Sequence, residues 1–451
     1  MRLNVVLGLG VSGFVASAGM AQTPVRAFVE IKIGDTLGSS TVSSLNDPYV
    51  NSLGQYGAVV GLADTTRSIV INGASVFNSS SDTLAVGGEG TMGISDAGGF
   101  IYSPTYNGED AVYTNNGLLL RGTEPAPGMP GMNSVFNSRP RMNAAGTAFW
   151  VGGVGPATTT TTRVFYTNPT PANPSASTPL IVGGGTYAGV TITAAGVEFG
   201  YDISDNGQYI NRLTATGTAA TAPFVALNGT TLIARAGQPT GQGDNWQNFS
   251  HYGVNNGGNH VISGDTDGVA ATDAFIAYNG AIGVREGATL GGRVLGGSIN
   301  ALSINNNNDV AFIWSLATPT GEGLFRAENG GVGTAQLIAQ TGDLLDTDGD
   351  GAADWTLADF NASGAIAPGL DLPDSGDIFV NVDLTPIGGG TNVEAIISFR
   401  IGGPVGCDSI DFNGDGLFPD NTDLEDFLSV FGGGPCSTGT CGDIDFNNDG
   451  L

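Results

Sequence analysis

The sequence predicts an all-β protein assembled from repeated units, and three observations support this prediction. Glycine accounts for 74 of the 451 residues, more than twice its average usage. Charged residues make up only 12% of the chain and hydrophobic residues 40%, a composition too apolar for a disordered chain. A short phrase also recurs about every 50 residues, which is typical of repeat architectures.

The recurring phrase is a polar residue, then two residues, then glycine or asparagine, then a run of β-forming residues. Its copies lie 44 to 61 residues apart. A phrase that returns in step along the chain indicates one structural unit for each copy. The seven copies begin at Asn51, Ser95, Asn143, Ser204, Asn255, Asn305 and Asn361.

A second phrase, Asn-Gly after a short apolar run, keeps step with the first. Asn-Gly tolerates positive φ at both central positions of a tight turn, so it is a strong hairpin signal. In the third copy Asn168-Pro169 stands in its place. The other copies of the phrase are Asn72-Gly73, Asn116-Gly117, Asn228-Gly229, Asn279-Gly280 and Asn329-Gly330.

Each period therefore holds about four short strands, which is the content of one propeller blade. We predict a seven-bladed β-propeller over residues 28–403, in which run 393–399 closes the ring with residues 28–31. Ring closure hides most strand edges. The alternatives are another β-repeat fold such as a solenoid, or two β-sandwiches in tandem.

The N-terminus has the pattern of a secretory signal. Arg2 is its only charge, an apolar stretch follows, and Gly19-Met20-Ala21 provides small residues for cleavage after Ala21. No other segment approaches 18 apolar residues, so we expect no transmembrane segment. We divide the chain into a signal peptide (1–21), a repeat domain (22–403) and a tail (404–451), and we expect a secreted or cell-surface protein.

The tail contains a calcium-loop pattern. Oxygen-bearing side chains fall at positions 1, 3 and 5 of the loop, glycine stands at position 6, and an amphipathic helix is expected over residues 423–431. The closing acid stands at position 13 instead of 12. A second loop starts at Asp445 and is cut off at Leu451. We predict that the first loop binds calcium through Asp411, Asn413, Asp415, the Leu417 carbonyl and Asp423.

These residues resemble the dockerin type I module, a duplicated calcium loop-helix unit. The resemblance covers about 45 residues and implies a cohesin-like or cell-surface protein partner, and the cut-off second loop implies an incomplete module. The signal, the repeats and the tail together resemble a group of secreted planctomycete proteins. Three cysteines flank the tail loops. A Cys407–Cys436 disulfide would stabilise so small a unit, with Cys441 left for a partner beyond the chain; three free thiols are the alternative.

A second calcium-loop pattern lies inside the seventh repeat, where no helix is expected to follow. Acidic residues occupy its positions 1, 3, 5 and 9, and calcium prefers such oxygen ligands. The alternative is a solvated Asp-Gly turn. The predicted ligands are Asp346, Asp348, Asp350 and Asp354.

The charge excludes one class of partner. The chain has 42 acidic and 14 basic residues, a net charge of −28, which opposes binding to nucleic acid or to an anionic membrane. With only two histidines, we expect neither a multi-histidine metal site nor histidine catalysis, and we interpret His251 and His260 as structural or exposed.

The sequence contains no Gly-x-Ser-x-Gly or His-Glu-x-x-His motif, so no catalytic residue is assigned. We therefore expect a non-catalytic binding or structural module, with a glycan as one possible ligand. The alternative is a carbohydrate-active enzyme, a glycoside hydrolase or polysaccharide lyase, displayed through the tail. Its carboxylates would meet only in space, and nothing selects Glu109, Glu198 or Glu286.

Overall fold

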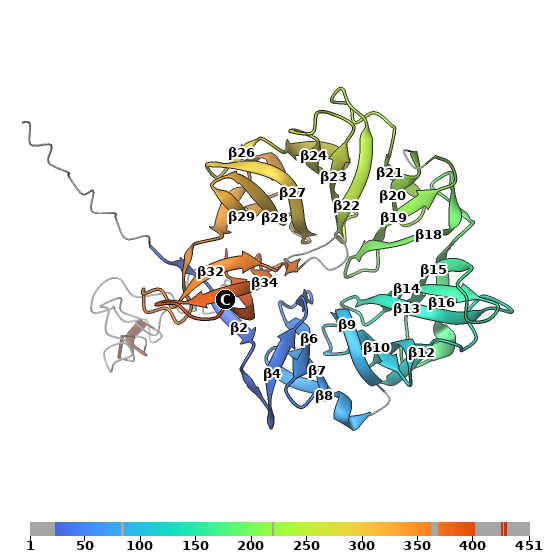
Figure 1. Cartoon of the computed structure of the whole chain (residues 1–451), viewed down its shortest axis with the longest axis horizontal. Coiled ribbons are helices and arrows are strands. Elements are labelled where there is room, and N and C mark those ends of the chain that lie inside the picture. Colours follow the sequence, from blue (N-terminus) through green and yellow to red (C-terminus); the bar gives the residue numbers. More distant parts are fainter. Residues whose placement is uncertain are drawn as a thin grey trace, which may run out of the picture.

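The protein is an all-β propeller, which confirms the predicted fold class. The computed structural model describes residues 23–82, 85–218, 221–361, 369–401, 425–426 and 428–430. Its strands form seven hydrogen-bonded sheets arranged in a ring around a central axis (Figure 1). No helix in this described part is both long and apolar enough to span a membrane.

The first four sheets follow one another along the chain. The first sheet contains β3 (Thr36–Leu37), β4 (Ser40–Leu45), β5 (Tyr49–Val50), β6 (Tyr56–Leu62), β7 (Arg67–Ile71) and β8 (Ala74–Asn78). The second contains β9 (Ala85–Ile94), β10 (Phe100–Tyr106), β11 (Glu109–Thr114) and β12 (Gly117–Arg121). The third contains β13 (Asn133–Met142), β14 (Ala148–Gly155), β15 (Thr162–Asn168) and β16 (Thr178–Val182). The fourth contains β17 (Thr186–Tyr187), β18 (Val190–Ile203), β19 (Tyr209–Ala215), β20 (Pro223–Leu227) and β21 (Thr231–Arg235).

The remaining sheets complete the ring. The fifth contains β22 (Trp246–Val254), β23 (His260–Thr266), β24 (Ala274–Tyr278) and β25 (Ala281–Arg285). The sixth contains β26 (Thr289–Leu290), β27 (Arg293–Ile304), β28 (Val310–Thr318), β29 (Thr320–Ala327) and β30 (Gln336–Gln340). The seventh contains β1 (Val25–Arg26), β2 (Phe28–Lys32), β31 (Leu344–Asp346), β32 (Trp355–Phe360), β33 (Leu370–Asp371), β34 (Ile378–Pro386) and β35 (Val393–Phe399). The 3₁₀ turns η1 (Ser79–Ser81), η2 (Pro174–Ala176) and η4 (Val332–Thr334) lie outside the sheets.

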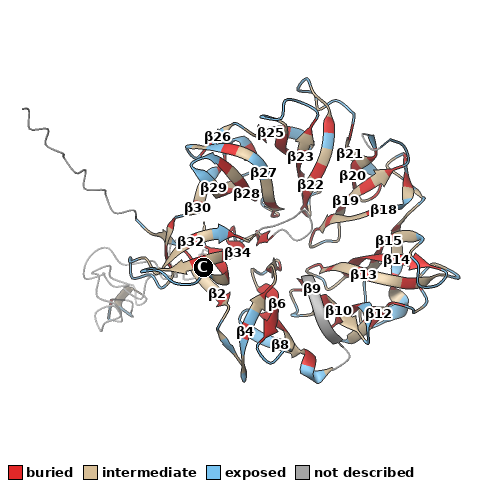
Figure 2. Ribbon diagram, viewed as in Figure 1, coloured by how far each residue is buried: buried red, intermediate tan, exposed pale blue. Residues whose placement is uncertain are grey.

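The hydrophobic core is divided among the junctions between sheets. Among the described residues there are seven buried clusters, and each joins side chains of two neighbouring sheets. A sheet held between two others is buried on both faces, so β6 reads as a continuous apolar run whose seven residues are all buried. Figure 2 shows these buried residues along the strands of the ring.

The two ends of the described ring meet in the seventh sheet. Strand β2 pairs antiparallel with β35, with Phe28 opposite Ser398 and Val29 opposite Ile397, and β1 pairs parallel with β31. This confirms the predicted closure of run 393–399 with residues 28–31. The ring is therefore held shut by non-covalent contacts between distant parts of the chain.

The Asn-Gly turns behave as predicted at four of the five positions. Asn72, Asn228, Asn279 and Asn329 have φ between 47° and 52°, and the glycine after each also has positive φ. Such a turn matches the twist of a hairpin. At Asn116-Gly117 only the glycine has positive φ, so the expected pair of positive φ values is wrong there.

The prediction that the seventh copy of the first repeat phrase begins at Asn361 is wrong. Six copies connect the innermost strand of a sheet to the next strand, but Asn361 directly follows β32, and residues 362–368 lie outside the described residues. The equivalent turn runs from Pro373 to Asp377, between β33 and β34, with Gly376 at φ 82°. Proline in the first position hid this copy from the pattern.

The tail is described only in part. Residues 425–426 and 428–430 are helical, within the helix expected over 423–431. The predicted ligands Asp411, Asn413, Asp415, Leu417 and Asp423, and the three cysteines, lie outside the described residues.

Candidate axial site

The repeat phrase forms a tight turn at the end of each innermost strand. In the fifth sheet the N–H of Asn255 donates to the carbonyl of Asn259 at 3.0 Å, and the N–H of Gly258 donates to the carbonyl of Asn255 at 2.9 Å. Gly258 has φ +76°, which explains glycine in the fourth position. The Asn255 side-chain oxygen accepts the Asn259 N–H at 3.0 Å, so the first residue stabilises its own turn.

The same first residue also bonds the turn of the next sheet. The Asn51 amide donates to the Ser95 carbonyl at 3.1 Å, and the Asn255 amide to the Asn305 carbonyl at 3.0 Å. The Asn305 amide continues to the Pro373 carbonyl at 3.1 Å. The first residue of the repeat phrase therefore forms hydrogen bonds across three junctions between neighbouring sheets.

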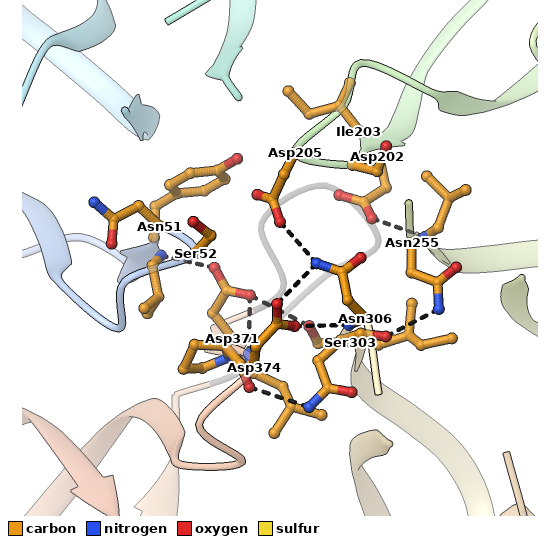
Figure 3. Close-up of a pocket in the computed structure, with 18 of the residues that line it drawn as sticks. Asn51, Ser52, Asp202, Ile203, Asp205, Asn255, Ser303, Asn306, Asp371 and Asp374 are labelled. Atoms are coloured by element: carbon orange, nitrogen blue, oxygen red, sulfur yellow. Dashed lines mark hydrogen bonds between the residues drawn. The ribbon is translucent and has the colours of Figure 1, made fainter. Parts of the chain in front are cut away.

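A small polar cavity of about 80 Å³ lies among the innermost strands, and side chains from six of the seven sheets line it. Figure 3 shows carboxylates and amides converging on it. Five of the lining residues stand two residues before a turn. The five lining residues at that position are Tyr49, Arg141, Asp202, Ser303 and Asp371.

Arg141 and Asp202 form an ion pair between the third and fourth sheets. The guanidinium lies 3.1 Å from the carboxylate, and both side chains are mostly buried. Tyr49 and Tyr201 place their rings 5.5 and 6.0 Å from the guanidinium carbon. Burial raises the pKa of Asp202 while Arg141 opposes the rise. The other Asp202 oxygen accepts the Val254 N–H at 3.0 Å, so this carboxylate bonds both neighbouring sheets.

Asp371 has the same role at the junction of the seventh and first sheets. Its carboxylate accepts the Val50 N–H at 2.7 Å, the Leu372 N–H at 2.9 Å and the Ser303 hydroxyl at 3.3 Å. These three hydrogen bonds occupy the carboxylate oxygens of Asp371. Burial raises the pKa of Asp371 to about 6.

An amide spans the mouth of the cavity. The side-chain nitrogen of Asn306 donates to Asp205 and to Asp374, at 2.9 Å each, and Figure 3 shows it between these carboxylates. Burial raises the pKa of Asp205, with Asp374 and Asp96 adding to the rise. Asp205 belongs to the fourth sheet and Asp374 to the seventh, so the bridge crosses the ring.

No sequence motif marks the axial residues. Their signal is positional, because each side chain two residues before a turn is directed toward the axis. At this position the second and fifth sheets have glycine, where an added Cβ would lie 2.1 Å from the Met142 nitrogen (Gly93) or 2.9 Å from an Ile304 methyl (Gly253). The position two residues before each turn is therefore the sequence signal that identifies the set.

The structure brings together three of the four ligands predicted in the seventh repeat. Ligand oxygens of Asp346, Asp348 and Asp354 all lie within 4.8 Å of one another, and Asp350 is not in the group. Asp346 accepts the Gly349 N–H at 2.6 Å and the Arg26 guanidinium at 3.1 Å. The loop joins β31 to β32, so it lies where β1 enters the ring.

The remaining candidates stay apart from the axial cavity. Glu109 and Glu198 lie in the second and fourth sheets, Glu286 directly follows β25 of the fifth, and none lines the cavity. His251 is buried and its Nδ1 lies 3.0 Å from the Ser263 hydroxyl. His260 is buried beside its turn, with Nδ1 3.1 Å from the Gly258 carbonyl, and both environments agree with the structural interpretation.

No protein-family model matches the chain, and no curated protein matches its sequence. Solved structures match at low identity. BBS1N in complex with ARL6DN is 10% identical with a TM-score of 0.38, covering 83% of this chain and 97% of that one. The WD40 β-propeller domain of Doa1 is 9% identical with a TM-score of 0.36, covering 82% and 96%. A gluconolactonase from Xanthomonas campestris is 12% identical with a TM-score of 0.33, covering 82% and 100%.

Proposed function

We propose that this protein is a secreted, non-catalytic binding or structural module in which each of the seven sheets serves as one blade. The observation that supports this most is the engagement of the axial carboxylates in bonds between sheets. Asp202 and Asp371 each accept a backbone N–H from the next sheet. A carboxylate held in this way positions strands instead of facing a substrate.

The size of the axial cavity supports the same proposal. Pockets for small-molecule ligands typically span about 300–1,000 Å³, whereas the axial cavity measures about 80 Å³. This volume suits a few water molecules, since one occupies about 30 Å³ in the liquid. Binding of a larger ligand is therefore assigned to the outer surface of the ring.

The aromatic residues also favour a module over an enzyme acting on sugars. All four tryptophans lie in the described part of the chain. Trp150, Trp246 and Trp314 are buried, and Trp355 is half-buried. The mouth of the axis is instead surrounded by Asn, Ser, Asp and Gly turns, so no indole lies there as a stacking platform for a sugar ring.

One observation favours the alternative, a glycoside hydrolase or polysaccharide lyase. Asp205 and Asp374 both bond the Asn306 amide, so two carboxylates lie close together at the axial mouth. A pair of carboxyl groups is the usual means of glycoside hydrolysis. In this arrangement the amide of Asn306 occupies the space between them.

Calcium binding is a further part of the proposal. The convergence of Asp346, Asp348 and Asp354 supports a calcium ion in the loop between β31 and β32, where it would relieve repulsion among the carboxylates. The tail loop, Asp411 to Asp423, is proposed as a second site on its sequence pattern and on the helical residues that follow it. A cohesin-like or cell-surface partner is proposed for this tail.

A glycan panel tests the central proposal. The full chain is incubated with a set of plant, algal and bacterial polysaccharides, and both retention on insoluble glycan and release of reducing ends or unsaturated products are measured. We expect no product above the level of the D205N/D374N double variant. The exposed Asp64→Asn change is the matched control. Turnover that the double variant loses and the control keeps would overturn the proposal and establish the enzyme.

A further inference from the structure

The seventh sheet meets its neighbours through carboxyl groups that lie close to one another. On the side of the sixth sheet, Glu322 of β29 faces Asp359 of β32. Both carboxylates accept the same Phe360 N–H, at 3.3 and 3.1 Å. The amide of Asn300 donates to Glu322 from β27. The two acids thus share one donor, the Phe360 N–H, across this junction.

The junction with the first sheet repeats the arrangement. The Asn381 amide of β34 donates to Glu394 of β35 at 3.0 Å, and Asn381 is also hydrogen-bonded to Asp47, which follows β4. Arg139 of β13 is the basic group that acts on Asp47, and Asp383 adds negative charge beside Glu394. One amide therefore holds two carboxyl groups from two sheets.

We propose that the seventh sheet is a proton-sensitive lock on the ring, in which the carboxyl groups on both of its junctions hold it closed when protonated and loosen it when ionised. The location gives the lock its effect. This sheet is built from both ends of the described ring, with β2 on β35 and β1 on β31. Opening these pairings opens the ring, whereas every other sheet is formed by one continuous segment.

The electrostatic environment agrees with the geometry. Burial raises the pKa of Asp47 to about 7, and Glu394 contributes to the rise. Burial and the neighbouring Asp359 raise the pKa of Glu322 to about 7. Burial also raises the pKa of Glu394. Each group therefore takes up its proton in the folded ring at a higher pH than in the unfolded chain.

The sign of the effect follows from this difference. A carboxyl group with a raised pKa in the folded state contributes its stability below its ordinary pKa near 4. That contribution is lost as the pH rises through the folded value, here about 7. The ring is thus expected to be tightest in mildly acidic solution and to loosen at its closing sheet above neutrality.

Hydrogen exchange at pH 5 and pH 8, corrected for the intrinsic exchange rate, tests the lock on the full chain. We expect the protection of amides in β2 and β35 to fall at least about tenfold between these pH values. Strands β14 and β15 contain no acidic residue, and their protection is expected to stay constant. An equal fall in both sets would overturn the proposal.

A double variant, Asp47→Asn with Glu322→Gln, separates the lock from general effects of pH. Neutral amides imitate the protonated acids, so β2 and β35 of this variant should keep at pH 8 the protection seen at pH 5. The exposed change Asp64→Asn is the matched control and should leave the pH dependence as it is in the parent. A double variant that loosens as the parent does refutes the proposal.

Thermal unfolding from pH 4 to pH 9 adds a measurement on the parent alone. The melting temperature is expected to decrease from pH 5 to pH 8, and a melting temperature that does not decrease over this range also contradicts the lock.

Discussion

Replacing Asn305 by alanine tests the role assigned to the repeat phrase. Asn305 is 3% exposed, and its side chain makes three hydrogen bonds. Its amide donates to the Pro373 carbonyl at 3.1 Å, and its oxygen accepts the N–H groups of Asn307 at 3.0 Å and of Asp309 at 2.9 Å. If the phrase holds the sheets together, this change weakens both the turn and the junction between the sixth and seventh sheets.

The expected loss follows from these three bonds. A neutral hydrogen bond contributes about 1 kcal/mol net, and a buried group left without a partner costs about 1–3 kcal/mol. Asp309 is buried, so its N–H cannot turn to water. We therefore expect Asn305→Ala to lower the free energy of unfolding by about 3 kcal/mol.

The chain offers a graded control. Serine already stands in the first position at Ser95 and Ser204, where its hydroxyl accepts the turn N–H at 3.0 Å in each case. Asn305→Ser keeps that bond and loses the amide bond to Pro373, so we expect about half the cost of alanine. Urea unfolding of the full chain measures both. An alanine variant within about 0.5 kcal/mol of the parent, or a serine variant as weak as alanine, would refute this reasoning.

Three further outcomes are expected. Gly264→Ala should destabilise the ring by more than about 2 kcal/mol, because the added Cβ would lie 2.0 Å from a backbone oxygen of β22. In the control Gly280→Ala the added Cβ meets nothing within 4 Å, so urea unfolding should show a cost of only about 1 kcal/mol. Arg141→Ala should cost about 3 kcal/mol by leaving the buried Asp202 unpaired, and unfolding at pH 7 checks it. Terbium luminescence of the full chain should show one calcium site fewer in Asp348→Ala, and an unchanged number of sites would exclude the loop.

The fold was predictable because its determinants are local. The Asn-Gly turns need positive φ at consecutive residues, and the composition of the chain supplies those residues in step with the strands. Asn72 and Asn228 show the expected geometry. The run 393–399 was also recognisable as the closing strand, because an apolar strand at each end of a ring has no other edge to pair with.

The axial site was not predictable in the same way, because its residues share a direction and not a chemistry. Tyr49, Arg141 and Ser303 differ in every property except their position two residues before a turn. A search for catalytic or metal-binding patterns passes over such a set. The mouth was harder still, since Asn306 and Asp205 meet across the ring from turns 101 residues apart.

The turn of the seventh sheet differs from the others in a way that affects how the ring closes. Pro373 takes the position that asparagine holds in other turns, and proline has neither an N–H nor a side-chain donor. Its carbonyl accepts the hydrogen bond from Asn305, but it has no side-chain amide that could donate to the first sheet. The junction that it leaves is bonded by Asp371, whose carboxylate accepts the Val50 N–H. Where an amide closes a junction, the bond does not depend on pH. At the junction between the seventh and first sheets an acid replaces the amide, and its pKa of about 6 adds one more titrating contact to the sheet that closes the ring.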